Sequence, residues 1–360
     1  MKVFIITIHH IHNFGSVYQA YSLYRFLKDN GYDAEIIDYR PKYYINGRNK
    51  IKTFVGKTLY LSSYLKRKTK FEKFIIENIK TTNQKFYTLN QLENFYKNSK
   101  EVFIAGGDQL WNDYHPCGCD DAYKLCFTKS NKKFSYATSM GRDNYTETEL
   151  INLADKIKDF NIITLRENST VHLLERYSNV PVKHVIDPVG LLDVDFLKKS
   201  AIKPKITEKY AVMYLADSSE ILNQSVQFLT EKMHLKIIHI CGFKKKCYCD
   251  VFEKDVGPQE ILGYILNADF VLSASFHATL FSILFNKQFA TLLPGERTNA
   301  RIEDILNYVN LSDRIIKNMK DINVLSKRID FVPVNKVIDE FREKSRKTLI
   351  NSLEELEKKL

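Results

Sequence analysis

The 360-residue sequence lacks any apolar run long enough to cross a membrane. Serine, histidine or lysine interrupts the most apolar stretches well short of the roughly 20 residues that a spanning helix needs. The opening segment Lys2–Ile8 is a short apolar run that histidines end, so it predicts a first β-strand rather than a secretory signal. We therefore expect a cytoplasmic protein. Peripheral contact with the inner face of the membrane is compatible with this expectation.

The sequence also lacks two common nucleotide-binding loops. Neither Gly-x-Gly-x-x-Gly nor a Walker lysine loop occurs, which argues against dinucleotide or ATP sites of those kinds. Cysteines are few, and two pairs have Cys-x-Cys spacing, Cys117 with Cys119 and Cys247 with Cys249. This spacing is one residue shorter than the usual zinc knuckle. We interpret the cysteines as free thiols, with zinc as the alternative, and expect no metal site.

Positive charge is abundant. The net charge of +11 and the pI of about 9.1 suit anionic partners, namely nucleic acids, phosphorylated or carboxylated small molecules, or anionic lipid. Residues 48–73 contain nine Lys/Arg residues and one acid, interleaved with leucine and aromatic residues. This segment is either a solvated basic loop with a helix or an amphipathic patch for anionic lipid or a lipid-linked acceptor. No RNA- or DNA-binding motif accompanies the charge, so we expect no nucleic-acid partner.

Strand and helix patterns alternate along the chain. Lys2–Ile8 reads as a strand, residues 17–27 have helical spacing that ends at Asn30-Gly31, and 34–38 reads as a second strand. Such strand–helix–strand units build parallel sheets. The pattern further predicts a strand and turn at 101–108, strands at 133–139, 162–165, 182–186, 210–214, 236–240 and 288–292, helices at 147–158 and 220–232, and a helix beginning near Pro258.

The length and this alternation predict an α/β protein with two Rossmann-like domains facing a cleft. The first domain is predicted at residues 1–170 and the second at 206–334, with a linker at 171–205. Residues 335–360 are highly charged, with apolar residues at helical spacing. They predict a long C-terminal helix that packs back on the first domain.

Three polar turns follow predicted strands, after Ile8, after Ala105 and after Ala274. Parallel α/β sheets bind ligands at the carboxyl ends of their strands, so these turns are candidate binding sites. The third turn is the most informative because it carries Ser275, His277 and Thr279 into a helix. Backbone N–H groups at a helix N-terminus, hydroxyls and an imidazole can hold an anion and move a proton.

Read together, these turns resemble motifs of the polysaccharide pyruvyl transferase family. Residues 7–16, Thr-Ile-His-His-Ile-His-Asn-Phe-Gly-Ser, resemble the family's opening Thr-x-His-x-x-x-Asn-Tyr-Gly-Ala. The further similar segments, in order, are Gln-Ala-Tyr at 19–21, Gly-Gly-Asp-Gln-Leu-Trp-Asn at 106–112, Ser-Tyr-Ala-Thr-Ser at 135–139, Arg-Glu-Asn-Ser at 166–169, Asp-Pro at 187–188, Ser-Phe-His-Ala-Thr at 275–279 and Asn-Ala-Arg-Ile at 299–302.

The resemblance implies a fold similar to GT-B glycosyltransferases. It also implies transfer of a pyruvyl group from phosphoenolpyruvate to two hydroxyls of a sugar, giving a cyclic ketal in a bacterial surface polysaccharide or lipid-linked precursor. Phosphoenolpyruvate is then a co-substrate, and no cofactor is expected. One departure matters: Ser275 stands where family members with the best-supported phosphoenolpyruvate use have arginine. The alternatives are a GT-B-type glycosyltransferase with a nucleotide-sugar donor and a non-catalytic glycan-binding protein.

Ketal formation needs groups that move protons and cations that hold the donor's carboxylate and phosphate. The predicted site residues are His277 and Asp108 for catalysis, Arg166, Ser275, Thr279 and Arg301 for the donor, and Asn13, Gly15 and His9 for the acceptor. Several have structural alternatives: His277 as a helix cap, Arg166 in an ion pair, Arg301 on a helix surface, Asp108 bonded to its own turn, Asn13 as an N-cap and His9 in packing.

Overall fold

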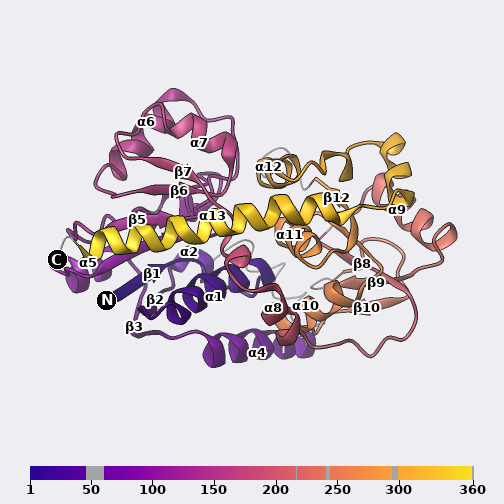
Figure 1. The fold of residues 1–360 in the computed structure, drawn as a ribbon. Helices are drawn as coiled ribbons and strands as arrows, with labels where there is room; N and C mark the ends of the chain where they lie inside the picture. The colour runs from indigo at the N-terminus through magenta and orange to yellow at the C-terminus, as the bar shows by residue number, and fades with distance from the viewer. Residues whose placement is uncertain (46–60, 216, 241–243, 294–298, 359–360) are drawn as a thin grey trace. The chain divides into compact units, whose positions relative to one another are not determined.

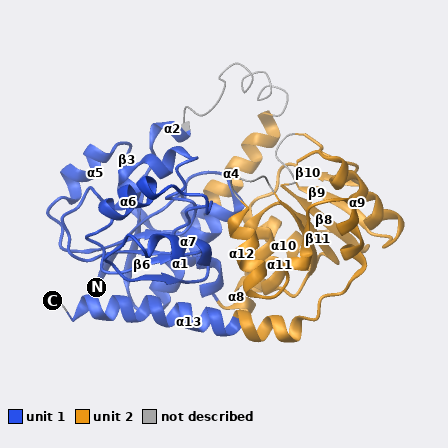
Figure 2. Cartoon of the chain, turned by 90° about the horizontal axis from the view of Figure 1, so that it is seen from above, with its two compact units in different colours: residues 1–49, 75–192, 339–360 blue, residues 50–74, 193–338 orange. Residues whose placement is uncertain are grey.

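The computed structural model describes residues 1–45, 61–215, 217–240, 244–293 and 299–358. Two compact units make up the chain (Figure 2). Unit 1 contains residues 1–49, 75–192 and 339–360, and unit 2 contains residues 50–74 and 193–338. Residues 48–60 of the basic segment predicted to touch lipid lie outside the described residues.

A five-stranded parallel sheet with the order β3-β2-β1-β4-β5 forms the centre of unit 1 (Figure 1). Ile5 of β1 pairs with Ile36 of β2 and with Ile104 of β4, and all three are fully buried. Burial on both faces explains the nearly continuous apolar sequences of these central strands. The strands are β1 (Lys2–Ile6), β2 (Asp33–Tyr39), β3 (Thr81–Phe86), β4 (Val102–Gly106) and β5 (Lys133–Tyr136).

Helices cover both faces of this sheet. On one face, α1 lies so close to β4 that a Cβ at Gly106 would be 2.4 Å from the Leu23 side chain. On the other face, Leu92 of α5 and Leu153 of α6 share a core with alternate strand residues such as Ile6. The remaining elements of unit 1 are α1 (Phe14–Asp29), α2 (Lys42–Ile45), α5 (Leu89–Tyr96), α6 (Glu147–Lys156), α7 (Asn168–Leu174) and a two-stranded parallel sheet of β6 (Ile163–Leu165) and β7 (Val182–His184).

Unit 2 repeats this design with a six-stranded parallel sheet in the order β10-β9-β8-β11-β12-β13. Met213 of β8 and Leu272 of β11 share a core with Leu222 and Val226 of α9. The strands are β8 (Tyr210–Tyr214), β9 (Lys236–Ile240), β10 (Val251–Glu253), β11 (Phe270–Ser273), β12 (Gln288–Leu292) and β13 (Ile315–Ile316). The helices are α8 (Val194–Ser200), α9 (Glu220–Glu231), α10 (Pro258–Asn267), α11 (Phe276–Leu284) and α12 (Ala300–Tyr308), and α4 (Leu61–Asn78) runs from unit 2 into unit 1.

Both sheets have the strand order of a doubly wound fold, in which the connections reverse direction at one point. The reversal lies between β1 and β4 in unit 1 and between β8 and β11 in unit 2. Ligands of such sheets bind outside the carboxyl ends of the strands at this point. The turn after β1, the turn after β4 and the turn after β11 are therefore the positions to examine.

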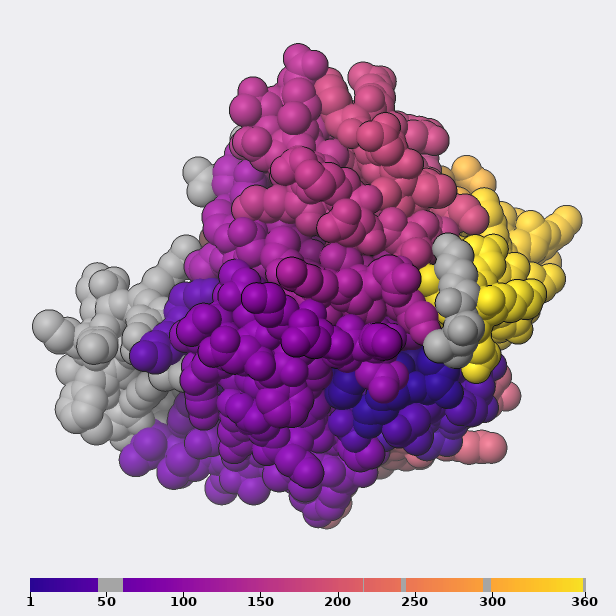
Figure 3. Space-filling model, turned by 90° about the vertical axis from the view of Figure 1, so that its left-hand side faces the viewer, coloured from indigo at the N-terminus to yellow at the C-terminus, as the bar shows by residue number. Residues whose placement is uncertain are grey.

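The long helix α13 (Phe331–Glu357) begins four residues before the predicted start, and its part from Asp339 onward belongs to unit 1. Arg342 of α13 donates from Nε to the carbonyl of Gly190 at 2.9 Å and from Nη2 to that of Leu192 at 2.7 Å. The yellow helix lies beside the magenta segment that carries β6 and β7 (Figure 3). Of these two strands, β7 falls in the stretch 171–205 predicted as a linker, of which 171–192 belong to unit 1.

None of the helices in the described ranges combines the length and apolarity that crossing a membrane requires.

Candidate active site

Asp108 lies in the turn after β4, at the reversal point of the unit 1 sheet. Its carboxylate accepts a hydrogen bond on each oxygen: the Ser16 hydroxyl donates to Oδ2 at 2.5 Å, and the Gln109 N–H donates to Oδ1 at 2.8 Å. Ser16 belongs to the first turn of α1, so the turns after β1 and β4 are tied together at this carboxylate. The structure thus places Asp108 where a ligand of this sheet is expected, and it also shows the bond to its own turn.

Gln19 and Gly107 fix the geometry beside Asp108. The Gln19 amide donates from Nε2 to Thr7 Oγ1 at 2.9 Å, to the Ile8 carbonyl at 3.1 Å and to the Ser16 carbonyl at 2.9 Å. A Cβ on Gly107 would lie 1.8 Å from Oε1 of Gln19, and Gly107 has a φ of 57°. Glycine is therefore the residue that this turn accepts, for reasons of both space and backbone conformation.

His9, predicted to bind the acceptor, is fully buried. Its Nδ1 lies 3.2 Å from the Thr7 carbonyl and its Nε2 lies 3.2 Å from Asp38 Oδ1. Arg40 also donates to Asp38, from Nε at 2.5 Å. Burial opposes ionisation of Asp38, but the hydrogen bonds from His9 and Arg40 outweigh it and hold the pKa of Asp38 at about 2. The geometry matches the packing alternative, and acceptor binding by His9 stays a prediction.

Asn13 and Gly15 lie at the start of α1. Asn13 is exposed, and its Oδ1 accepts from the Ser16 N–H at 3.2 Å, which is an N-cap. Gly15 is buried in the first helical turn. The structure shows the capping role for Asn13, and acceptor binding by either residue stays a prediction.

Arg166 is 4% exposed and forms a buried ion pair. Its Nη1 donates to Oδ2 of Asp187, and its Nε lies 3.7 Å from Oε1 of Glu167. The structure therefore shows the ion-pair alternative for Arg166. Donor binding by this guanidinium stays a prediction, and it requires the donor to share or displace a buried carboxylate.

The third turn leads from β11 into α11, at the reversal point of the unit 2 sheet. Ser275 is the N-cap of α11 and accepts from the Ala278 N–H at 3.4 Å. Thr279 is 1% exposed, and its hydroxyl donates to the Ser275 carbonyl at 3.0 Å and lies 2.9 Å from Thr291 Oγ1. Thr279 thus supports the turn from behind, whereas Ser275 is only half-buried.

His277 and Arg301 each lie close to the ring of Phe276. The His277 ring lies 5.2 Å from the Phe276 ring, and the Arg301 guanidinium lies 5.8 Å from the centroid of the same ring. His277 is 6% exposed and lies in the first turn of α11, where backbone N–H groups lack helical acceptors. An imidazole and a guanidinium therefore both lie near the Phe276 ring at the N-terminus of α11 in unit 2.

Sequence reasoning missed the polar partners in unit 1. Ser16 binds Asp108 although the two residues are 92 positions apart, and Asp38 binds His9 across two strands. His10, next to the predicted His9, is a further candidate. The sequence offered one indication for Ser16: it is a hydroxyl residue in the first turn of the helix that follows β1.

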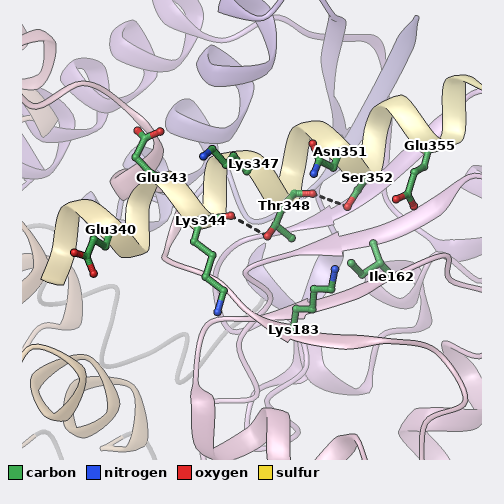
Figure 4. Close-up of a pocket in the computed structure, with 10 residues that line it drawn as sticks. All are labelled: Ile162, Lys183, Glu340, Glu343, Lys344, Lys347, Thr348, Asn351, Ser352 and Glu355. Carbon is green, nitrogen blue, oxygen red and sulfur yellow. Dashed lines mark hydrogen bonds between the residues drawn. The ribbon is translucent and has the colours of Figure 1, made fainter.

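A groove of about 490 Å³ beside α13 is a separate feature of unit 1 (Figure 4). Lys183, Lys344 and Glu343 are among its charged lining residues, and no predicted site residue lines it. In the part of the chain that the structure describes, no group of three or more His, Cys, Asp or Glu residues could hold a metal ion, and the five cysteines there are free thiols. Cys241 lies outside the described residues.

Comparisons with known proteins agree with the resemblance noted in the sequence. The model of the polysaccharide pyruvyl transferase family matches residues 13–295. No curated protein sequence matches significantly. Solved structures of UDP-GlcNAc 2-epimerases match nearly the whole chain. The enzyme from Methanocaldococcus jannaschii has 13% identity and a TM-score of 0.56 over 98% of this chain and 99% of its own, and the enzyme from Rickettsia bellii has 12% identity and a TM-score of 0.56 over 98% and 96%.

These similarities establish the fold. Together with the two parallel sheets and α13, they confirm the predicted α/β class with Rossmann-like parts of the GT-B type and a long C-terminal helix. The cleft that the sequence predicts between the two parts stays a prediction.

Proposed function

Because the chain belongs to the polysaccharide pyruvyl transferase family, we propose that it transfers a pyruvyl group from phosphoenolpyruvate to two hydroxyls of a sugar. The product is a pyruvate ketal in a bacterial surface polysaccharide or its lipid-linked precursor. The observation that supports this most is the position of His277 in the first turn of α11, at the reversal point of the unit 2 sheet, with Arg301 near the neighbouring Phe276 ring.

The reaction balances without an oxidant or a cofactor. One sugar hydroxyl forms a C–O bond to C2 of phosphoenolpyruvate while C3 gains a proton and becomes a methyl group. The second hydroxyl forms a C–O bond to the same carbon as the bond to phosphate breaks. Of the two hydroxyl protons, one matches the proton gained at C3 and the other leaves with the phosphate.

The residues have separate roles in this proposal. In unit 2, His277 delivers the proton to C3, and Arg301 with the N–H groups of α11 holds the donor's charges. In unit 1, Asp108 accepts the proton of an attacking hydroxyl. Its Ser16 and Gln109 contacts use one lone pair on each oxygen and leave others for a ligand. Arg166 binds the donor's carboxylate or phosphate by sharing or displacing the Asp187 carboxylate that it already holds.

The first test is a calorimetric titration of the purified protein with phosphoenolpyruvate, UDP-, GDP- and CMP-sugars. We expect saturable binding of phosphoenolpyruvate that weakens at least tenfold in Arg301→Gln. The exposed Arg328 provides the matched control, and Arg328→Gln should bind as the parent does. His277→Gln should retain binding but lower the rate of phosphate release by about 10²–10⁴-fold.

Nucleotide-sugar transfer is the rival outcome. Ser275 in place of arginine favours it, and a Methanocaldococcus jannaschii UDP-GlcNAc 2-epimerase of similar fold has been solved in complex with UDP-GlcNAc and UDP. Tight binding of a nucleotide sugar together with no binding of phosphoenolpyruvate would overturn the proposed donor.

The proposal includes action at the cytoplasmic face of the membrane, on a lipid-linked acceptor. On α4, Leu61 and Leu65 are each 47% exposed, and the Lys66 and Lys68 side chains are 67% and 41% exposed. Exposed leucines beside lysines suit an anionic lipid surface.

Co-sedimentation with vesicles of phosphatidylglycerol and phosphatidylcholine tests this contact. Lys66→Glu/Lys68→Glu should lower the bound fraction several-fold, whereas Lys203→Glu/Lys209→Glu, an equal charge change elsewhere in unit 2, should not. Equal loss in both variants would mean that net charge alone is responsible.

A further inference from the structure

His10 differs sharply from its neighbour His9. Both ring nitrogens of His9 lie within hydrogen-bond distance of protein oxygens, whereas neither ring nitrogen of His10 has a partner among the described residues. Both His10 nitrogens are also shielded from solvent. A buried polar group without a partner costs free energy, about 1–3 kcal/mol, and its presence in a fold requires a reason such as a ligand.

Tyr44 connects His10 with Asp108. The Tyr44 ring packs edge-on against His10, with 5.5 Å between the ring centroids, and lies 4.9 Å from the ring of Tyr43. Burial is the main cause that raises the pKa of the Tyr44 hydroxyl, and the nearby Cys117 thiol and Asp108 carboxylate raise it further. Tyr44 is half-buried in α2, which directly follows β2. These residues therefore gather at the carboxyl edge of the unit 1 sheet.

The charge states of this cluster suit a neutral polyhydroxylated ligand. Burial, followed by the nearby charge of His9, lowers the pKa of His10 to about 3, so its imidazole is neutral with one donor and one acceptor nitrogen. Asp108 can only accept. An anionic ligand would meet the Asp108 carboxylate, whereas a sugar hydroxyl can donate to Asp108 and a second hydroxyl can bond to His10. The face of the Tyr44 ring can pack against the C–H groups of a sugar ring.

We propose that His10, Tyr44 and Asp108 form the subsite that holds the hydroxyl pair of the acceptor sugar, with Ser16 as the residue that positions Asp108. This inference rests on the proposed function for the identity of the acceptor, and it names the residues that recognise it. It moves acceptor recognition from His9 to His10.

The test measures sugar binding separately from donor binding. The probes are methyl glycosides of galactose, glucose, mannose and N-acetylmannosamine, observed by saturation-transfer NMR with the full-length protein. We expect at least one glycoside to bind saturably, and the signal to fall at least tenfold in His10→Phe. His10→Gln, which keeps a donor and an acceptor, should restore most of it. His172→Phe changes an exposed histidine of the same unit and should bind as the parent does.

The urea midpoint distinguishes a binding role of His10 from a structural role. If His10 served only to stabilise the fold, its replacement would lower the midpoint. Because His10→Phe removes two unpartnered nitrogens, we expect its urea midpoint to be equal to or higher than that of the parent. A lower midpoint together with unchanged sugar binding would overturn the proposal, as would absence of binding to all four glycosides. If glycosides bind through His10 but phosphoenolpyruvate does not bind, the subsite stands and the proposed donor fails.

Discussion

Replacing Gly107 with alanine tests how tightly the turn that carries Asp108 is held. The φ of 57° at Gly107 is left-handed, and an L-residue there costs about 1–2 kcal/mol. The new Cβ would also lie 1.8 Å from Oε1 of Gln19, so that amide has to move. Its Nε2 carries two N–H donors, which lie within hydrogen-bond distance of three buried oxygens, and each hydrogen bond is worth about 1 kcal/mol. If two are lost, the free energy of unfolding falls by roughly 3–4 kcal/mol in total.

Urea unfolding followed by tryptophan fluorescence measures this change. Trp111 is the single tryptophan of the chain, is 2% exposed and belongs to unit 1, so its emission reports unfolding of the unit that is altered. Gly31→Ala is the matched control. Gly31 has a φ of 84° in the same unit, but a Cβ there would meet nothing within 4 Å, so only the backbone cost of about 1–2 kcal/mol remains.

A double-mutant cycle separates the two contributions. In a Gln19→Ala background the conflict with Gln19 is gone and Pro188 Cγ at 3.1 Å is the nearest atom, so Gly107→Ala should cost only slightly more than Gly31→Ala. The reasoning is refuted if Gly107→Ala is no more destabilising than Gly31→Ala in the parent, or if its full cost persists without Gln19.

Three further predictions concern stability. The folded-state pKa values of His184 and His239 are lowered to about 4 by burial, so the unfolded chain binds more protons between pH 6.5 and pH 4. The free energy of unfolding, measured in urea, should therefore fall from pH 6.5 toward pH 4.5 by up to about 1.4 kcal/mol per pH unit for each group, and His239→Phe should flatten this slope. Arg142→Lys should cost about 2 kcal/mol by calorimetry, because the buried guanidinium forks onto Asp113 at 2.9 and 2.7 Å and lysine cannot. Arg342→Met should cost about 2–4 kcal/mol in urea, since two carbonyls lose their donor, and a loss below 1 kcal/mol would show that water replaces it.

The buried strands could be predicted from sequence because burial on both faces leaves a continuous apolar run. Tyr210–Tyr214, Lys236–Ile240 and Gln288–Leu292 have the predicted bounds. β3 (Thr81–Phe86) was missed because it is an edge strand with exposed polar residues at its centre. The strand predicted to run to Ile8 ends at Ile6, because the carbonyls of Thr7 and Ile8 bond to side chains instead of a neighbouring strand.

The site could be predicted in outline only. Strand ends followed by polar residues placed Asp108 and His277 at the reversal points of the two sheets. The partners of these residues depend on tertiary contacts that no local pattern encodes, such as the Ser16 hydroxyl on Asp108. The two adjacent histidines looked alike in the sequence, and only the fold shows that His9 is engaged while His10 has no partner among the described residues.

Unit 1 is built from three separate segments of the chain, and this has a consequence for biosynthesis. Its last segment, residues 339–360, follows the whole of 193–338, which belongs to unit 2. At a ribosomal rate of about 10 residues per second, roughly 15 s separate the emergence of Leu192 from that of Arg342. During that interval the carbonyls of Gly190 and Leu192 lack the Arg342 guanidinium that donates to them in the finished protein. The unit whose synthesis begins first is therefore completed last.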